Sequence, residues 1–385
     1  MNSTCKYTAN LCASVLFRKL DFSHGSYKYP EPAEAALRAH KLAELAPVIG
    51  HHLRHLIIQI KISRGDNNAT LYDTACATIL KNAPHLRCLK LVYAHNDASY
   101  HSILYGALAE VNELEAFEFW EGDDARPMTK ALTEVPTPRD DILRILLSSQ
   151  STSLRSLAIR GRIILTDELY CALRDSACKL HTLEIRRALP EDSFTKPVVW
   201  GCAPFLRHLQ LYLCSPHVAS TVTALMRGCL GLKLETVTLW MNGARSDETD
   251  LRPPANLGWA GAQLEKLDLD HFLPWEMECF IPIPTKLLVA TRMAAVHFTK
   301  LIGDGAFPGL QTLVVSDRWK SSVQYERDYR NLEETCKTRG VEFRCANLSN
   351  PHPDNSTMKE PIERVCKCWF LRDLSPDYHP KGKGF

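Results

Sequence analysis

One short apolar phrase recurs in the middle of this chain, and it constrains the fold more than any other feature. The phrase reads SLRSLAIRGR, then KLHTLEIRRA, then FLRHLQLYLC. Its first leucines are Leu154, Leu180 and Leu206, so the step is 180 − 154 = 26 residues and then 206 − 180 = 26 residues. A sequence that repeats itself at a fixed step of about 20 to 50 residues is typical of stacked structural units.

The same L-x-x-L-x-L pattern extends through most of the chain. Outside the central triplet, its first apolar residues are Leu53, Leu86, Leu114, Leu234, Leu264 and Leu310. A phrase at Phe17, Leu20 and Phe22 precedes these, Met293, Val296 and Phe298 form a weaker one, and Val341 and Phe343 fit a last strand. We therefore predict an α/β leucine-rich-repeat solenoid of about ten to twelve irregular repeats, with a parallel inner sheet and outer helices.

The spacing within the phrase explains this prediction. The fourth and sixth residues lie two apart, so both side chains leave the same face of a strand. Segments with helical spacing of apolar residues should cover that face, and they occupy residues 32–50, 71–81, 100–111 and 140–147. Residues 121–138 hold three prolines and are predicted to form a surface loop. The solenoid should span residues 23–345, followed by a C-terminal cap and flexible tail over 346–385.

Composition narrows the class of partner. The chain of 385 residues carries 46 lysines and arginines against 44 aspartates and glutamates, so neither a nucleic acid nor a membrane surface is an expected partner. Its 14 cysteines are scattered and no secretory signal opens the sequence, which favours reduced thiols in an intracellular protein, cytoplasmic or nuclear. No window of about 18 apolar residues predicts a membrane span.

Two stretches of sequence carry a resemblance to a known family. KNAPHLRCLKL and WGCAPFLRHLQL resemble the recurrent helix-end, proline and leucine-strand phrase of fungal F-box proteins with leucine-rich repeats, and this likeness covers residues 51 to 345. Residues 1–22 resemble the last part of an F-box, with Cys5, Leu11, Leu16 and Leu20 at the apolar or small positions of its closing helices. The Leu-Pro at the front of an F-box does not occur there, so we expect a partial F-box-like remnant.

The resemblance implies a function. F-box proteins grip the Skp-type adaptor of a cullin–RING ubiquitin ligase and recruit its substrates. The chain would then be a non-catalytic protein-recognition subunit, and binding of a Skp-type adaptor would depend on what the F-box remnant retains. The alternative is a free-standing repeat scaffold that has lost adaptor binding.

Motifs for catalysis are missing from the sequence. We find no phosphate-binding glycine loop, no G-x-S-x-G turn and no H-E-x-x-H helix, so we predict no enzyme, no cofactor and no metal site. Asp268 and Asp270 could form a carboxylate pair, but a solvated strand face is the favoured explanation of both. Cys366 and Cys368 are a remote candidate for a metal or redox site.

A row of side chains between the core leucines is the candidate binding site. The seventh position of successive phrases holds Trp120, Arg160, Arg186, Tyr212 and Trp240, and these side chains should point to the concave side. Tryptophan, tyrosine and arginine are the residues enriched in binding hot spots, so we predict a protein partner with an acidic, partly apolar surface. In the alternative, the aromatic rings stack on neighbouring strands and Arg186 pairs with Glu184.

Overall fold

The structure of the chain is a computed structural model. It describes residues 15–21, 32–60, 68–93, 102–121, 146, 153–160, 164–165, 179–190, 205–213, 234–241, 264–270, 283–290, 295–316 and 323–346. The predicted C-terminal cap and tail, most of the F-box-like segment and the predicted loop over 121–138 lie outside them. So does the predicted helix over 140–147, except for the buried Leu146.

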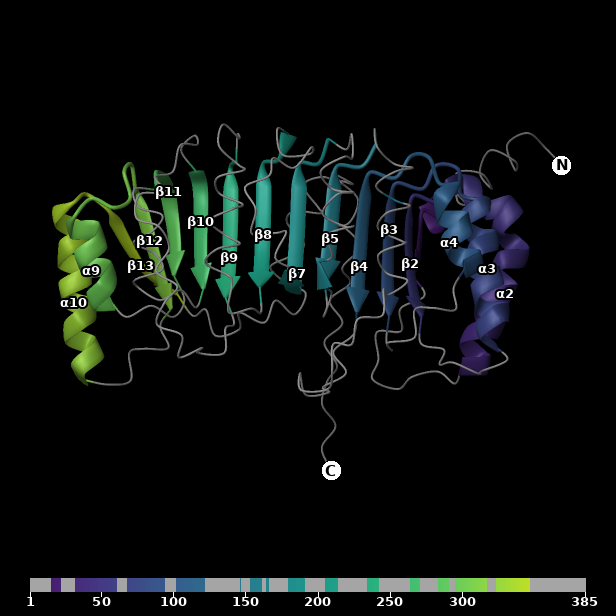
Figure 1. The fold of residues 1–385 in the computed structure, drawn as a ribbon, viewed down its shortest axis with the longest axis horizontal. Helices are drawn as coiled ribbons and strands as arrows, with labels where there is room; N and C mark the ends of the chain where they lie inside the picture. Colours follow the sequence, from purple (N-terminus) through teal and green to yellow (C-terminus); the bar gives the residue numbers. More distant parts are fainter. Residues whose placement is uncertain are drawn as a thin grey trace, which may run out of the picture.

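The strands form a single continuous parallel sheet (Figure 1). Their order in the sheet follows their order in the chain, except that the short β6 pairs only with β7. The strands are β1 Lys19–Asp21, β2 His55–Ile60, β3 Cys88–Tyr93, β4 Ala116–Glu121, β5 Ser156–Arg160, β6 Ile164–Leu165, β7 Thr182–Pro190, β8 His208–Leu213, β9 Thr236–Met241, β10 Leu264–Asp270, β11 Thr285–Ala290, β12 Thr312–Ser316 and β13 Glu342–Ala346. In a parallel sheet whose strands follow chain order, every connection runs from the end of one strand back to the start of its neighbour, as in a solenoid.

The register of the sheet aligns equivalent positions of the repeated phrase. In the central triplet, Leu157 pairs with Leu183, and Leu183 pairs with Leu209. These fourth-position leucines are fully buried, as are the first-position leucines Leu154 and Leu180. The phrase therefore predicts both the strands and the face of each strand that enters the core.

Helices lie at both ends of the sheet and pack on its leucine face (Figure 1). They are α2 Pro32–Ile49, the 3-10 turn η1 Gly50–His52, α3 Asn68–Lys81, α4 Ser102–Ala109, α9 Ala295–Gly303 and α10 Val323–Thr338. The helices predicted over 32–50, 71–81 and 100–111 are confirmed within a few residues at their ends. The chain is thus an α/β protein with a solenoid-like repeat arrangement. Among the described helices, none is both long and apolar enough to cross a bilayer.

One predicted strand phrase was wrong. Met293, Val296 and Phe298 were expected to form a strand, but Ala295–Gly303 is the helix α9. Its buried residues include Ala295, Phe298 and Ile302, which are spaced three and four residues apart as on one side of a helix. Val296 lies on the exposed side. A short apolar segment can fit both the two-residue period of a strand and the 3.6-residue period of a helix, and this segment is a helix.

The strand that occupies this place in the sheet is β11, which the pattern search missed. Its register places Thr285, Leu288 and Ala290 opposite the three core residues of β10. All three side chains are buried, and the Thr285 hydroxyl donates a hydrogen bond of 3.1 Å to the carbonyl of Leu287. A threonine and an alanine at two leucine positions conceal the phrase, although both residues fit the core once the hydroxyl is bonded.

Gly50 marks a close approach between successive repeats. It follows α2 directly, as the sequence predicts for a helix stop. A Cβ atom at this position would lie 2.6 Å from the carbonyl carbon of Asn82, and closer still to its oxygen. Asn82 follows the end of α3, so the absence of a side chain at Gly50 allows the first two helical layers to pack closely.

We expect Gly50→Ala to lower the free energy of unfolding by about 1–3 kcal/mol, because the added methyl overlaps fixed backbone. Urea denaturation followed by circular dichroism measures the change. Gly106→Ala is the matched control, since a Cβ atom there meets nothing within 4 Å and the residue lies inside α4. The control should gain about 0.5–1 kcal/mol from helix propensity. Equal stability of wild type and Gly50→Ala would contradict the close approach.

Candidate binding surface

The face of the sheet opposite the leucines is built from the third, fifth and seventh residues of each phrase. We call it the open face, because the described helices pack against the leucines on the other side. Several of its side chains are nevertheless polar and buried, among them Glu118, Thr182 and Glu184. The open face is therefore a surface of closely packed polar groups, in which each group depends on its neighbours across the strands.

The five predicted site residues occupy one row across adjacent strands. Trp120 of β4 pairs with Arg160 of β5, and Arg160 pairs with Arg186 of β7. The row continues from Arg186 to Tyr212 of β8 and from Tyr212 to Trp240 of β9. Parallel strands lie about 4.8 Å apart, so the row is about 19 Å long. The side chains of the last three residues lie outside the described part of the structure, and their role in binding stays a prediction.

The register of the sheet changes just after this row. Between Arg186 and Ala188 the pairing of β7 with β8 shifts, so that Ala188 lies opposite Leu213. Such a bulge turns the following side chains and ends regular pairing, and bulges are frequent beside functional sites. It gives the row a defined border at the carboxyl ends of the strands.

Arg160 is the centre of an ion-pair network on the open face. Its Nε and Nη2 atoms donate to the two carboxylate oxygens of Glu184 at 2.8 and 3.2 Å. Its Nη1 lies 2.8 Å from Oε1 of Glu118, which also lies 3.1 Å from the ammonium of Lys90. The contacts of this Glu118 oxygen are ionic, without aligned hydrogen bonds. Two cations and two carboxylates therefore balance each other across β3, β4, β5 and β7.

This network gives Arg160 a different role from the one expected for a hot spot. Only 12% of its side chain is exposed, and Glu184 is exposed by 5%. The guanidinium is held from both sides by carboxylates, so it organises the surface before any partner arrives. The alternative in which Arg186 pairs with Glu184 involves a side chain outside the described part, but Glu184 is already engaged by Arg160.

Trp120 presents an aromatic ring beside the network. The ammonium of Lys90 lies 4.7 Å from the ring centroid, within the range of a cation–π contact. Lys90 thus contacts both Glu118 and Trp120, which fixes the ring next to a neutralised group of charges. The sequence pattern identified Trp120 but not Lys90. Lys90 is the fifth residue of its phrase on β3 and lies opposite the oppositely charged Glu118 on β4.

Unsatisfied polar atoms lie one strand further along the open face. The hydroxyl of Thr182 on β7 and Oε1 of Gln210 on β8 are buried without a hydrogen-bond partner among the described residues. Beside them, Nδ1 of His208 lies 2.9 Å from the hydroxyl of Thr236. A buried polar atom without a partner lowers stability by about 1–3 kcal/mol.

The other chemical candidates have simple accounts. Asp268 lies 3.3 Å from the ammonium of Lys266, an ion pair on a solvated strand. Four described cysteines, Cys76, Cys88, Cys336 and Cys345, are free thiols. Within the described ranges, no group of three or more histidine, cysteine or acidic residues could hold a metal ion. Cys366 and Cys368 lie outside those ranges.

We expect Arg160→Met to lower the free energy of unfolding by about 3–5 kcal/mol, because Glu118 and Glu184 would be left as buried charges without their shared cation. Arg330→Met is the control: it removes an exposed ion pair of 2.6 Å with Glu326 and should cost less than about 1 kcal/mol. Urea unfolding of both variants measures the difference. Similar losses in the two would show that the network is not a stabilising unit.

His55 lies half-buried at the start of β2, at the third position of the phrase that begins with Leu53. Burial lowers its pKa from 6.5 to about 4, and the positive charges of Arg18, Lys19, Arg54 and Arg87 add to the shift. The folded protein therefore keeps this imidazole neutral at a pH where the unfolded chain already binds a proton.

The sign of the resulting pH dependence follows directly. Between pH 6.5 and about 4 the unfolded state binds more protons at His55, so stability should fall as the pH is lowered through this window. His55→Gln should show a smaller fall, while His297→Gln, an exposed position on α9, should follow the wild type. Thermal midpoints measured across the window test this. A slope unchanged by His55→Gln would refute the assignment.

Neither a protein-family model nor a curated protein sequence matches the chain. Among solved structures, a chain from "Crystal structure of Rad7 and Elc1 complex in yeast" aligns over 82% of this chain and 90% of its own length, with 14% identity and a TM-score of 0.29. A likeness at this TM-score carries no argument about the function of the chain.

Proposed function

We propose that this chain is a leucine-rich-repeat solenoid of the F-box type that recognises a protein partner on its open face and carries out no catalysis. The partner would be the substrate of a cullin–RING ubiquitin ligase inside the cell, and the chain its receptor subunit. The observation that supports recognition is the single row of Trp120, Arg160, Arg186, Tyr212 and Trp240 across five adjacent strands.

The chemistry of the row supports a protein partner. Aromatic and arginine side chains dominate binding energy at protein interfaces. The network of Lys90, Glu118, Arg160 and Glu184 is neutral and preorganised, so a partner need not order these side chains on binding.

The rival proposal is a scaffold that binds the same partner without an adaptor. The two proposals share the open face and differ at the N-terminus, where residues 1–22 resemble the end of an F-box. Co-elution of the full chain with a purified Skp-type adaptor supports the receptor. Failure to co-elute, with partner capture intact, supports the scaffold.

We expect Trp120→Ala and Arg186→Glu each to abolish capture of the bound partner while the thermal midpoint changes by no more than a few degrees. The partner is first identified by cross-linking to the wild-type chain and is then purified, so that loss of binding is measured directly by calorimetry. Trp120 is chosen because its ring is partly exposed, and Arg186 because its position lies in the centre of the row.

Leu71→Ala is the matched control for this experiment. It removes a partly exposed apolar side chain from α3, on the side of the sheet that carries the leucines. This variant should bind normally. Normal binding by Trp120→Ala and Arg186→Glu would exclude the open-face row as the recognition site.

A further inference from the structure

A second row of side chains runs along the edge of the sheet where the strands begin. It is formed by the second residue of each phrase. The carbonyl of this residue typically accepts hydrogen bonds from the following phrase. The carbonyl of Arg54, for example, accepts from the N–H groups of Arg87 and Cys88, both at 2.9 Å. We call it the second-position row. Its members are Arg18, Arg54, Arg87, Glu115, Arg155, His181, Arg207, Glu235, Glu265, Lys286 and Gln311.

The row is strongly polarised along the molecule. From β1 to β8 it holds five arginines and a histidine against the single Glu115, and from β9 to β12 it holds two glutamates, one lysine and one glutamine. Where the signs meet, the charges pair: Arg207 with Glu235, and Lys286 with Glu265 at 2.6 Å. The acidic half is therefore largely neutralised by neighbours, and the positive charge gathers at the N-terminal end.

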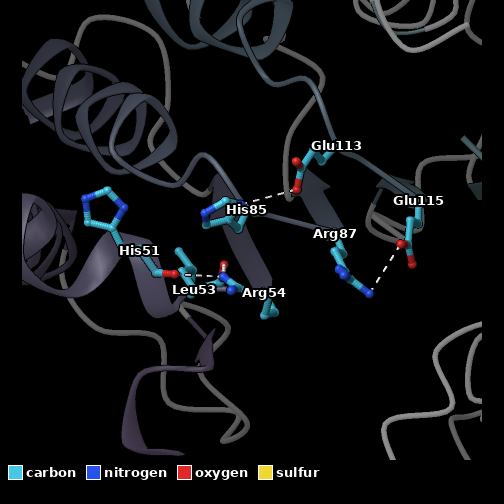
Figure 2. Close-up of polar contacts among 7 residues, drawn as sticks. All are labelled: His51, Leu53, Arg54, His85, Arg87, Glu113 and Glu115. Carbon is cyan, nitrogen blue, oxygen red and sulfur yellow. Dashed lines mark hydrogen bonds and ion pairs between the residues drawn. The ribbon is translucent and has the colours of Figure 1, made fainter. Parts of the chain in front are cut away.

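Figure 2 shows how the side chains lie at that end. Arg54 donates from Nη1 to the backbone carbonyls of His51 and Leu53, at 2.8 and 3.0 Å. Arg87 lies 3.4 Å from Glu115, in a pair whose side chains are 56% and 36% exposed. Carbonyl groups fix the position of the Arg54 guanidinium without removing its charge, and an exposed pair such as Arg87–Glu115 can exchange its partner at little cost.

The electrostatic effects agree with a concentration of positive charge. The pKa of Arg54 is lowered by burial and then by the charges of Arg87 and Arg18, with Glu113 opposing. Glu113 itself lies 3.4 Å from His85. Arg18 is exposed and adjoins Arg54 in the row, since its carbonyl accepts from the Arg54 N–H at 2.9 Å.

We propose that Arg18, Arg54 and Arg87, with Lys19 beside them, form a docking site for an acidic segment of a partner protein. The three arginines span two strand spacings, about 10 Å. This is the length of about three residues of extended chain, so a short run of glutamates or aspartates fits the site. Arginine is suited to this role because its planar donors match a carboxylate in pairs.

The shape of the charge distribution favours an acidic peptide over a nucleic acid. A long polyanion that follows the row away from Arg87 meets Glu115 and, beyond Arg207, reaches Glu235 and Glu265. Each of these carboxylates repels phosphate. A short acidic segment ends before it reaches the acidic half. Its carboxylates can replace that of Glu115 as the partner of Arg87, because the two groups are chemically the same. The site is separate from the open-face row and does not rest on the function proposed for it.

The test uses the full chain and a fluorescent peptide with a run of glutamates, with the corresponding glutamine peptide and an oligothymidylate of equal charge as comparison ligands. Fluorescence anisotropy should show binding of the glutamate peptide that weakens as the ionic strength rises. The double variant Arg18→Gln/Arg87→Gln should bind about fivefold more weakly, as expected for the loss of two exposed ion pairs.

Arg207→Gln is the matched control, because it removes an arginine from the same row at the point where it already pairs with Glu235. This variant and Trp120→Ala should bind the peptide like the wild type. If the double variant unfolds, Lys19→Gln, at an exposed position of β1, replaces it and should weaken binding. Any of four results would overturn the proposal. The wild type does not bind the peptide, or the arginine and lysine variants bind it as tightly as the wild type does. Alternatively, Arg207→Gln loses as much affinity as the double variant, or the oligothymidylate binds more tightly than the peptide.

Discussion

The paired backbone hydrogen bonds between successive phrases are the constraint on which the rest of the structure depends. The carbonyl of Arg155, for instance, accepts from the N–H groups of His181 and Thr182 at 2.7 and 3.1 Å, and the same paired arrangement links each phrase to the next from β1 to β10. It sets the register at the start of each strand. A slip of one residue would transfer every leucine to the open face, so the apolar core and the backbone pairing select the same register. Connections of different length leave this register unchanged, which is why the steps between phrases vary while the strands remain in line.

A fixed register also determines which side chains meet. Residues at equivalent positions lie about 4.8 Å apart on neighbouring strands, so like charges in one row repel and opposite charges pair. On the open face, Lys90 and Glu118 are opposite one another at the fifth position. The fifth position of β5 is the uncharged Ala158, and Arg160, two residues further on, supplies the cation that pairs with both Glu118 and Glu184. Burial makes the balance necessary, because an unpaired charge at these positions would be far more costly than at the surface.

Much of the fold is predictable from the sequence, because the leucines report directly on the strand faces. Phrases such as that of Leu206 and Leu209 place both the strand and its buried residues, whereas β11 is concealed because Thr285 replaces a leucine and bonds its hydroxyl locally. The row of candidate site residues follows from counting positions within the phrase. The engagement of Arg160 by two carboxylates does not follow, because it requires the strand order, in which β5 neighbours β7, and the depth of burial.

The same scaffold therefore presents two surfaces with different electrostatics. On the open face, Arg160 is neutralised by Glu118 and Glu184, so the surface offers the ring of Trp120 more than net charge. At the N-terminal end of the second-position row, Nη1 of Arg54 is bonded to two carbonyl groups, which position the guanidinium and leave its charge. A partner that reads the first surface must match shape and hydrogen bonding, while one that reads the second must supply negative charge. The second and seventh positions of a phrase lie five residues apart, about 16 Å along a strand. Substitutions in one row should therefore act independently of substitutions in the other.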